Sequence, residues 1–281
     1  MVALVLVICF AKPLYDLVRY SVHSELYSHI LLIPLISLYL IWPNRRDLAL
    51  DSEPARRFAW WPLVTGIAML GGYWLAVWSG WKPRIEDYLA LMTLSFLSFL
   101  AGACFLFLGK ETLRKVAFPA MFLIFLAPIP VFLLGWIETF LQHGSADAAY
   151  VLFRTSGMPV FRDGLVFQLP GFSMQVAPEC SGIHSTLVLF ITSLLAGHVF
   201  LVSPWRRAVL TLAVIPLALV RNGFRIFTLG ELCVRVSPDW INSELHHRGG
   251  PIFFALSLVP FFLLLLFLRK GERRKDNGVM E

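Results

Sequence analysis

A cysteine, a glutamate and a histidine stand close together in the stretch A-P-E-C-S-G-I-H-S, residues 177–185. Cys180 is a candidate nucleophile because it lies where a helix is predicted to begin. There the free backbone N–H groups and the positive end of the helix dipole favour a thiolate. The small neighbours Ser181 and Gly182 leave room for a peptide carbonyl to approach the sulfur atom. Glu179 acts in the opposite direction, since an adjacent carboxylate disfavours the thiolate unless a cation neutralises it.

Two further polar clusters are predicted at the ends of apolar helices, R-N-G-F-R at 221–225 and L-H-H-R-G-G at 245–250. Ionisable groups at such depths in a membrane are costly, which makes them functional candidates. The candidates outside the cysteine stretch are Arg221, Asn222, Arg225, His246 and His247, and His184 is added from the stretch itself.

The composition indicates an integral membrane protein. Of the 281 residues, 58% are hydrophobic and only 15% are charged, so the chain is more apolar than an average soluble domain. We predict an all-α polytopic fold with about eight transmembrane helices. The apolar runs are 1–20, 25–42, 60–78, 88–108, 116–137, 181–202, 206–228 and 250–268. The first run lacks the basic start and cleavage site of a signal peptide, so we expect a tilted or broken span there.

Residues 158–176 carry the strand signal of the chain, with D-G and P-G as turns. The predicted strands are 159–162, 165–169 and 172–176. The preceding segment, 138–154, is predicted to be an amphipathic helix along the outer surface. We therefore expect a small hairpin cap at about 158–178, whose strand edge could hold an extended peptide. The predicted organisation is a single membrane domain, 1–281, that includes this cap.

The basic residues predict the orientation. Short loops on the side of the tail R-K-G-E-R-R-K carry paired or clustered Lys and Arg, the pattern that marks the cytoplasmic side. We expect both termini and the tail 269–281 in the cytoplasm, and the three polar clusters on the outer face of the plasma (inner) membrane. A helix starting at Arg207 on the inner side rises about 27 Å by Arg225, which puts Arg225 at the outer interface. Arg221, one turn deeper, needs a partner or a wet cavity.

Other interpretations of these residues remain open at this point. An arginine at a helix end can be a snorkelling anchor. Cys180 and Cys233, predicted on the same oxidising side, could form a disulfide. Cys180, Glu179 and the histidines could bind zinc, but they lack the H-E-x-x-H and C-x-x-C spacings, so we expect no metal and no other cofactor.

The order of three motifs is similar to that of a known family. E-C-S-G at a helix start, N-G-F-R-I near the end of the next span and H-H-R-G-G-P-I-F-F at the last resemble the exosortase/archaeosortase family of membrane-embedded cysteine transpeptidases. The resemblance covers residues 25–268 and is most specific over 170–254. It implies cleavage of carboxy-terminal sorting tails, which consist of a short motif such as P-E-P, a transmembrane helix and a basic cluster. The new end would be transferred to an amine acceptor on a glycan or lipid.

The resemblance also implies roles for individual residues. Cys180 matches the nucleophile, and Arg225 matches the arginine of N-x-x-R, with Arg221 as the second choice. His246 best matches the family histidine because of its spacing to the following glycine and phenylalanines, although His247 stands beside it. Asn222, Glu179 and His184 are supporting candidates.

Two other functions remain as alternatives. A non-catalytic transporter or polysaccharide-export component would need polar residues along several spans, and the apolar run below Arg221 disfavours this. An acyl or glycyl transferase would use the same thiol on another substrate. In each case membrane lipid surrounds the protein, and we expect no nucleic-acid partner.

Overall fold

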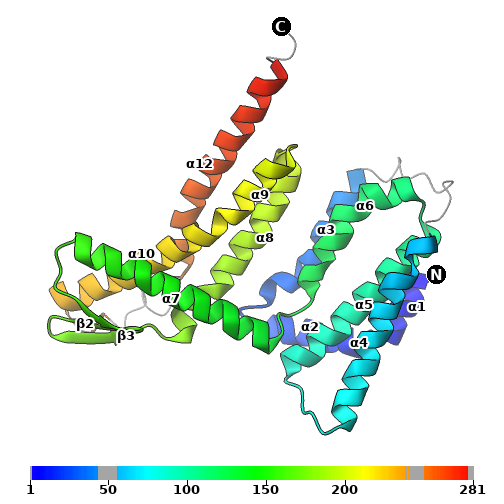
Figure 1. Cartoon of the computed structure of the whole chain (residues 1–281), viewed down its shortest axis with the longest axis horizontal. Helices are drawn as coiled ribbons and strands as arrows, with labels where there is room; N and C mark the ends of the chain where they lie inside the picture. Colours follow the sequence, from blue (N-terminus) through cyan, green and yellow to red (C-terminus); the bar gives the residue numbers. More distant parts are fainter. Residues whose placement is uncertain (1, 44–55, 238, 241–249, 278–281) are drawn as a thin grey trace. The chain divides into compact units, whose positions relative to one another are not determined.

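The computed structural model describes residues 2–43, 56–237, 239–240 and 250–277, and it is mostly helical with one small sheet (Figure 1). The chain forms two compact units, Met1–Leu134 and Gly135–Glu281. Within the described residues, five helices are long and apolar enough to cross a membrane, or six if one broken pair counts as a span. The five are Arg56–Trp78, Ile85–Phe107, Ile183–Phe200, Pro204–Arg235 and Gly250–Glu272, and the pair is Glu111–Leu126 with Val131–Thr155. The predicted helical membrane fold is confirmed.

The first unit contains two of the long apolar helices, α4 and α5, together with several shorter ones. Its elements are α1 (Val2–Cys9), α2 (Ala11–His23), η1 (Ser28–Leu31), α3 (Ile33–Ile41), η3 (Arg56–Phe58), α4 (Trp60–Trp78), α5 (Ile85–Phe107), α6 (Lys110–Phe122) and η4 (Leu123–Leu126). The predicted first span is broken at Phe10, between α1 and α2. Helices α4 and α5 pack closely at Gly102, where an added Cβ would lie 2.6 Å from the Leu63 side chain.

The predicted continuous span 116–137 was wrong, because the helix stops after η4 and a new helix, α7 (Val131–Thr155), begins. Pro128 and Pro130 explain the break, since proline has no N–H for a helical hydrogen bond. Asp87 accepts a hydrogen bond from the Val131 backbone N–H at 2.9 Å and so stabilises the start of α7. The segment 138–154 is therefore part of a longer helix, whose buried residues follow the helical period.

The second unit holds α7, the sheet and four more helices. These helices are α8 (Ile183–Phe200), α9 (Pro204–Leu212), α10 (Val214–Arg235) and α12 (Gly250–Asn277). The predicted span 206–228 is divided at Ala213, where α9 ends and α10 begins. Pro216 explains the break, because in a continuous helix a proline ring clashes with the carbonyl group of the residue four positions earlier. Helix α10 ends at Arg235, seven residues beyond the predicted end of that span.

The sheet consists of β1 (Phe161–Asp163), β2 (Val166–Leu169) and β3 (Phe172–Gln175), all antiparallel in the order β1-β2-β3. The three predicted strands are confirmed. Its two turns use glycines with positive φ, Gly164 at +57° and Gly171 at +74°, as the D-G and P-G signals indicated. One face of the sheet buries Phe167 and Met174 against residues of α7 and α10, so the cap has a hydrophobic core of its own.

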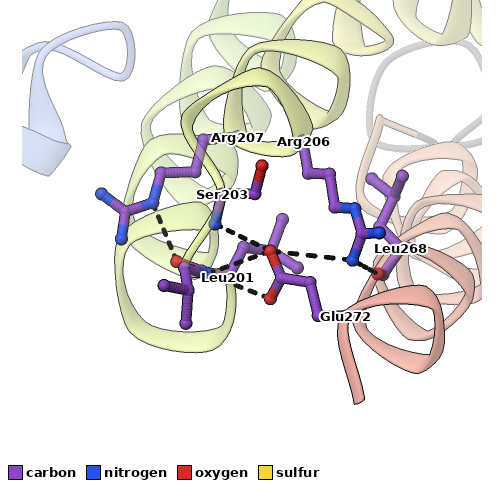
Figure 2. A network of polar contacts seen from close by, with 7 residues as sticks. Leu201, Ser203, Arg206, Arg207, Leu268 and Glu272 are labelled. Carbon is purple, nitrogen blue, oxygen red and sulfur yellow. Dashed lines mark hydrogen bonds and ion pairs between the residues drawn. The ribbon is translucent and has the colours of Figure 1, made fainter. Parts of the chain in front are cut away.

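A polar network ties the loop between α8 and α9 to α12 (Figure 2). The Glu272 carboxylate accepts hydrogen bonds from the backbone N–H groups of Val202 and Ser203, the latter at 2.8 Å, and lies 3.8 Å from Arg206. Arg206 Nη1 also donates to the Leu268 carbonyl at 3.1 Å. These contacts hold the carboxy-terminal end of α8. The cysteine cluster lies at the other end of this helix, just before Ile183.

Candidate active site

The cysteine cluster folds as a short turn in front of a long helix. Pro178–Ser181 form the 3₁₀ turn η5, Gly182 follows with φ 72° and ψ 20°, and α8 begins at Ile183. The backbone of Cys180 therefore lies just before α8, rather than in its first turn as the sequence suggested. The side chains of Glu179 and Cys180 lie outside the described part of the structure.

The chain that leads into this turn is held from two sides. The Val176 N–H donates to the Leu165 carbonyl at 3.0 Å and so extends the pairing of β2 with β3. Gln142, a buried residue of α7, donates from Nε2 to the Val176 carbonyl. Sequence reasoning missed Gln142, because nothing in the sequence of α7 indicates that this side chain contacts Val176. Together these hydrogen bonds fix the direction in which the backbone approaches Cys180.

Gly182 is the point where α8 and α10 meet. Its carbonyl accepts hydrogen bonds from Thr186 Oγ1 at 2.8 Å and from Arg221 Nη2 at 3.2 Å. A Cβ at this position would lie 3.1 Å from Arg221 Nη2 and 3.2 Å from Asn222 Cγ. The positive φ favours glycine here, and the close approach of α10 leaves little room for a Cβ.

Arg221 is buried, with 7% of its surface exposed, and it contacts the turn that carries Cys180. Its Nη2 donates to Thr186 Oγ1 at 3.2 Å in addition to the Gly182 carbonyl. Both acceptors are neutral, although a buried guanidinium is costly unless its charge is compensated. Among the described residues, Arg221 Nη1 has no hydrogen-bond partner. We predicted that Arg221 needs a partner in the membrane. Among the described residues, the structure supplies partners for Nη2 but not for Nη1.

The other candidates from α10 differ in their surroundings. Asn222 is buried beside Gly182, and Arg225 is half-buried one turn after Arg221. Helix α10 continues ten residues past Arg225, so the expectation that Arg225 stands near a helix end was wrong. The reason is tertiary packing, because the continuation buries Leu229 and Gly230, and Gly230 packs against the α7 ring of Phe153.

Of the three candidate histidines, the structure describes His184. His184 is exposed in the first turn of α8. His246 and His247 lie outside the described residues, so their predicted roles stay predictions. Within the described ranges, no group of three or more His, Cys, Asp and Glu residues is placed to hold a metal ion.

The structure thus joins the backbone of the Cys180 turn to Arg221 and Asn222. It adds Thr186, which sequence reasoning missed, and a buried position for Ser181, which the sequence singled out only for its small size. Thr186 stands one helical turn after Gly182 and accepts a hydrogen bond from Arg221. Ser181, next to Cys180, is buried. The arrangement places the guanidinium N–H donors of Arg221 beside the turn that contains Cys180. Donors in such a position are suited to stabilise an anion that forms at this turn.

Comparison with known families identifies a family that matches this chain. A family model described as transmembrane exosortase (Exosortase_EpsH) matches residues 21–263, which is most of the chain and includes all three polar clusters. Comparisons with curated proteins and with solved structures gave no match.

Proposed function

The chain belongs to the transmembrane exosortase family, and from this premise we propose that it is a cysteine transpeptidase acting on the carboxy-terminal sorting tails of exported proteins. The observation that carries the proposal is the contact between buried Arg221 and Gly182, two residues after Cys180. A buried cation that holds the backbone of a candidate nucleophile is expensive as a purely structural device. It is useful where negative charge develops during a reaction.

The proposed reaction has two acyl-transfer steps. The Cys180 thiolate attacks the carbonyl carbon at the sorting motif, and the carbonyl π electrons move to oxygen as the C–S bond forms. A guanidinium of the 221–225 cluster stabilises this oxyanion. The C–N bond then breaks as His246, or its neighbour His247, donates a proton to the leaving amine. An amine acceptor then attacks the thioester and passes its proton to the histidine that gave one up, so that a new amide forms, the C–S bond breaks and the Cys180 thiolate is released.

The sheet offers a binding mode for the sorting motif. In the order β1-β2-β3, strand β3 pairs with β2 on one edge, and no other described strand pairs with its second edge. Five residues after its last residue, Gln175, the chain reaches Cys180. An extended peptide added along the other edge of β3 would run toward the cysteine. The transmembrane helix of the substrate would dock against the bundle, which accounts for a nucleophile placed at the end of a membrane helix.

The proposed side of the membrane follows from the two ends of α8. The Cys180 turn precedes α8, and the basic pair Arg206 and Arg207 follows its other end. Because clustered basic residues in short loops favour the cytoplasm, we place the turn on the outer face of the plasma membrane.

Cysteine labelling tests this orientation in a variant without the native cysteines. A cysteine replacing Ser173, exposed in β3, should react with an impermeant maleimide in intact cells. A cysteine replacing Val202, exposed at the other end of α8, should react only after the cells are permeabilised. The reverse pattern would place the turn in the cytoplasm and contradict the proposed substrate class.

Analysis of a substrate's carboxyl terminus tests the function. The protein is co-expressed with an exported reporter that ends in a P-E-P motif, a transmembrane helix and a basic cluster, and the product is examined by mass spectrometry. We expect loss of the tail and an added amine-containing group at the new end. A free carboxylate at the new end would show that the enzyme hydrolyses the bond and does not transfer the product to an amine. An uncut tail would contradict the proposal. A reporter with the motif scrambled is the control.

The alternative of a transporter finds no support in the second unit. Toward the inner end from Arg221, the buried residues of α9 and α10 include Leu210, Val214 and Ala218, and Leu210 and Val214 belong to a hydrophobic core with α8 and α12. Between Leu210 and Arg221, the buried residues that the structure describes on this face are therefore apolar.

A further inference from the structure

Ser181 has a buried hydroxyl that the fold does not use. Only 1% of Ser181 is exposed, and among the described residues its Oγ has no hydrogen-bond partner. Most buried polar groups in native proteins are hydrogen-bonded, so an unsatisfied hydroxyl at a functional turn calls for a reason. Ser181 directly follows Cys180, which makes a bound substrate the natural acceptor for this donor.

A second unsatisfied donor lies at the same turn. Arg221 Nη2 is fixed by the Gly182 carbonyl and by Thr186 Oγ1, whereas Nη1 has no hydrogen-bond partner among the described residues. Gly182 is the residue after Ser181, so the guanidinium is anchored one residue from the unsatisfied hydroxyl. Two buried donors without a hydrogen-bond partner among the described residues therefore belong to the turn that follows Cys180 and to the arginine bonded to it, and such donors are suited to bind an oxygen atom on which negative charge develops.

We propose that Ser181 contacts the substrate directly, and that its hydroxyl and Arg221 Nη1 donate hydrogen bonds to the carbonyl oxygen of the sorting motif as Cys180 attacks. This inference rests on the proposed function. The hydroxyl keeps its proton throughout, because it stabilises the oxyanion without transferring a proton to it. When the C–N bond breaks, the electron pair returns from oxygen to carbon and the same two donors contact the thioester carbonyl. Thr186 is a positioning residue, since it holds the guanidinium through Nη2.

The proposal predicts opposite effects on stability and activity for one substitution. Ser181→Ala removes a buried hydroxyl that makes no hydrogen bond, so the melting temperature should stay the same or rise. Loss of an oxyanion donor should nevertheless lower kcat by roughly 10²-fold, with KM nearly unchanged. A purely structural serine would not separate the two measurements in this way.

The experiment uses the full chain in membranes or detergent, with cleavage of a tail-bearing reporter and thermal unfolding measured side by side. A peptide aldehyde that ends at the sorting motif supplies a second measurement, because its adduct with a cysteine is tetrahedral and carries the same oxygen. Its affinity should fall in Ser181→Ala by a factor similar to that in kcat/KM. Ser37→Ala is the matched control, since Ser37 is also buried with an unpartnered Oγ but lies on α3, in the other unit. It should cleave the reporter normally.

Two results would overturn the inference. Cleavage by Ser181→Ala within twofold of the wild type would show that the hydroxyl does not contact the reacting oxygen. Loss of activity together with an equal loss of thermal stability would show a structural role. Failure of the proposed function has a different signature, namely a reporter that stays uncut by the wild type or that is cut equally well by Cys180→Ala.

Discussion

Cys180→Ala should abolish removal of the sorting tail while the protein still accumulates in the membrane. The substitution removes the side chain that attacks the sorting motif in the proposed mechanism. Without it no acyl-enzyme can form, even if the oxyanion donors are in place. Cleavage of a co-expressed reporter, followed by immunoblotting of the tailed and processed forms, measures the effect. Cys9→Ala and Cys104→Ala are the matched controls, because both cysteines lie on helices of the first unit, and they should process the reporter normally.

Cys233 separates catalysis from a disulfide. This residue is buried on α10, with 1% of its surface exposed, and a bond to Cys180 is the alternative that the sequence left open. If Cys233→Ala loses processing as completely as Cys180→Ala at equal protein levels, the disulfide becomes the better explanation. Normal processing by Cys233→Ala leaves Cys180 as the nucleophile.

Arg221→Lys should lower the cleavage rate by roughly 10²-fold or more, the scale of losing one oxyanion donor. The planar guanidinium contacts the Gly182 carbonyl and Thr186 through Nη2 and still presents Nη1. A lysine ammonium keeps the charge but cannot reproduce this fork. A snorkelling anchor needs only a charge on a long stem, so it would tolerate lysine. Single-turnover cleavage of the reporter by purified variants measures the difference.

Arg225→Lys is the control, and it should be milder because Arg225 is only half-buried, one turn further along α10. The match to N-x-x-R alone favours Arg225, whereas the contact with Gly182 favours Arg221. A strong loss in Arg225→Lys with near-normal cleavage by Arg221→Lys would restore the choice made from the motif. Tolerance of lysine at both positions would remove support for any catalytic role of this cluster.

Local signals in the sequence predicted the elements better than their limits. The D-G and P-G turns located all three strands, since their glycines supply the positive φ that the turns need. The break before α7 was missed although Pro128 and Pro130 are visible, because the apolar run 116–137 had the length of a span. The true end of α10 was not predictable from hydropathy, since Leu229 and Gly230 are helical through packing against other elements of the second unit.

The candidate site was predictable in outline, but its contacts were not. The sequence placed Cys180 and Arg221 at the same side of the membrane, from the alternation of spans and the charges of the loops. It could not show that Arg221 reaches a backbone carbonyl and Thr186, because this depends on how closely α8 and α10 approach at Gly182. Periodicity identifies a buried face, whereas the register between two packed helices is a tertiary property.

Helix α10 makes the cap and the cysteine turn a single mechanical element. One part of it carries Arg221, which is bonded to the turn, and about two turns further on Ile226 and Gly230 are wedged into the core beneath the sheet. Because an α-helix is stiff over so short a distance, we expect a change in the packing of the sheet to shift Arg221 as well. A larger side chain at Gly230, which packs against Phe153 and Leu169, is therefore expected to disturb the contact between Arg221 and Gly182 although it lies in another part of the helix.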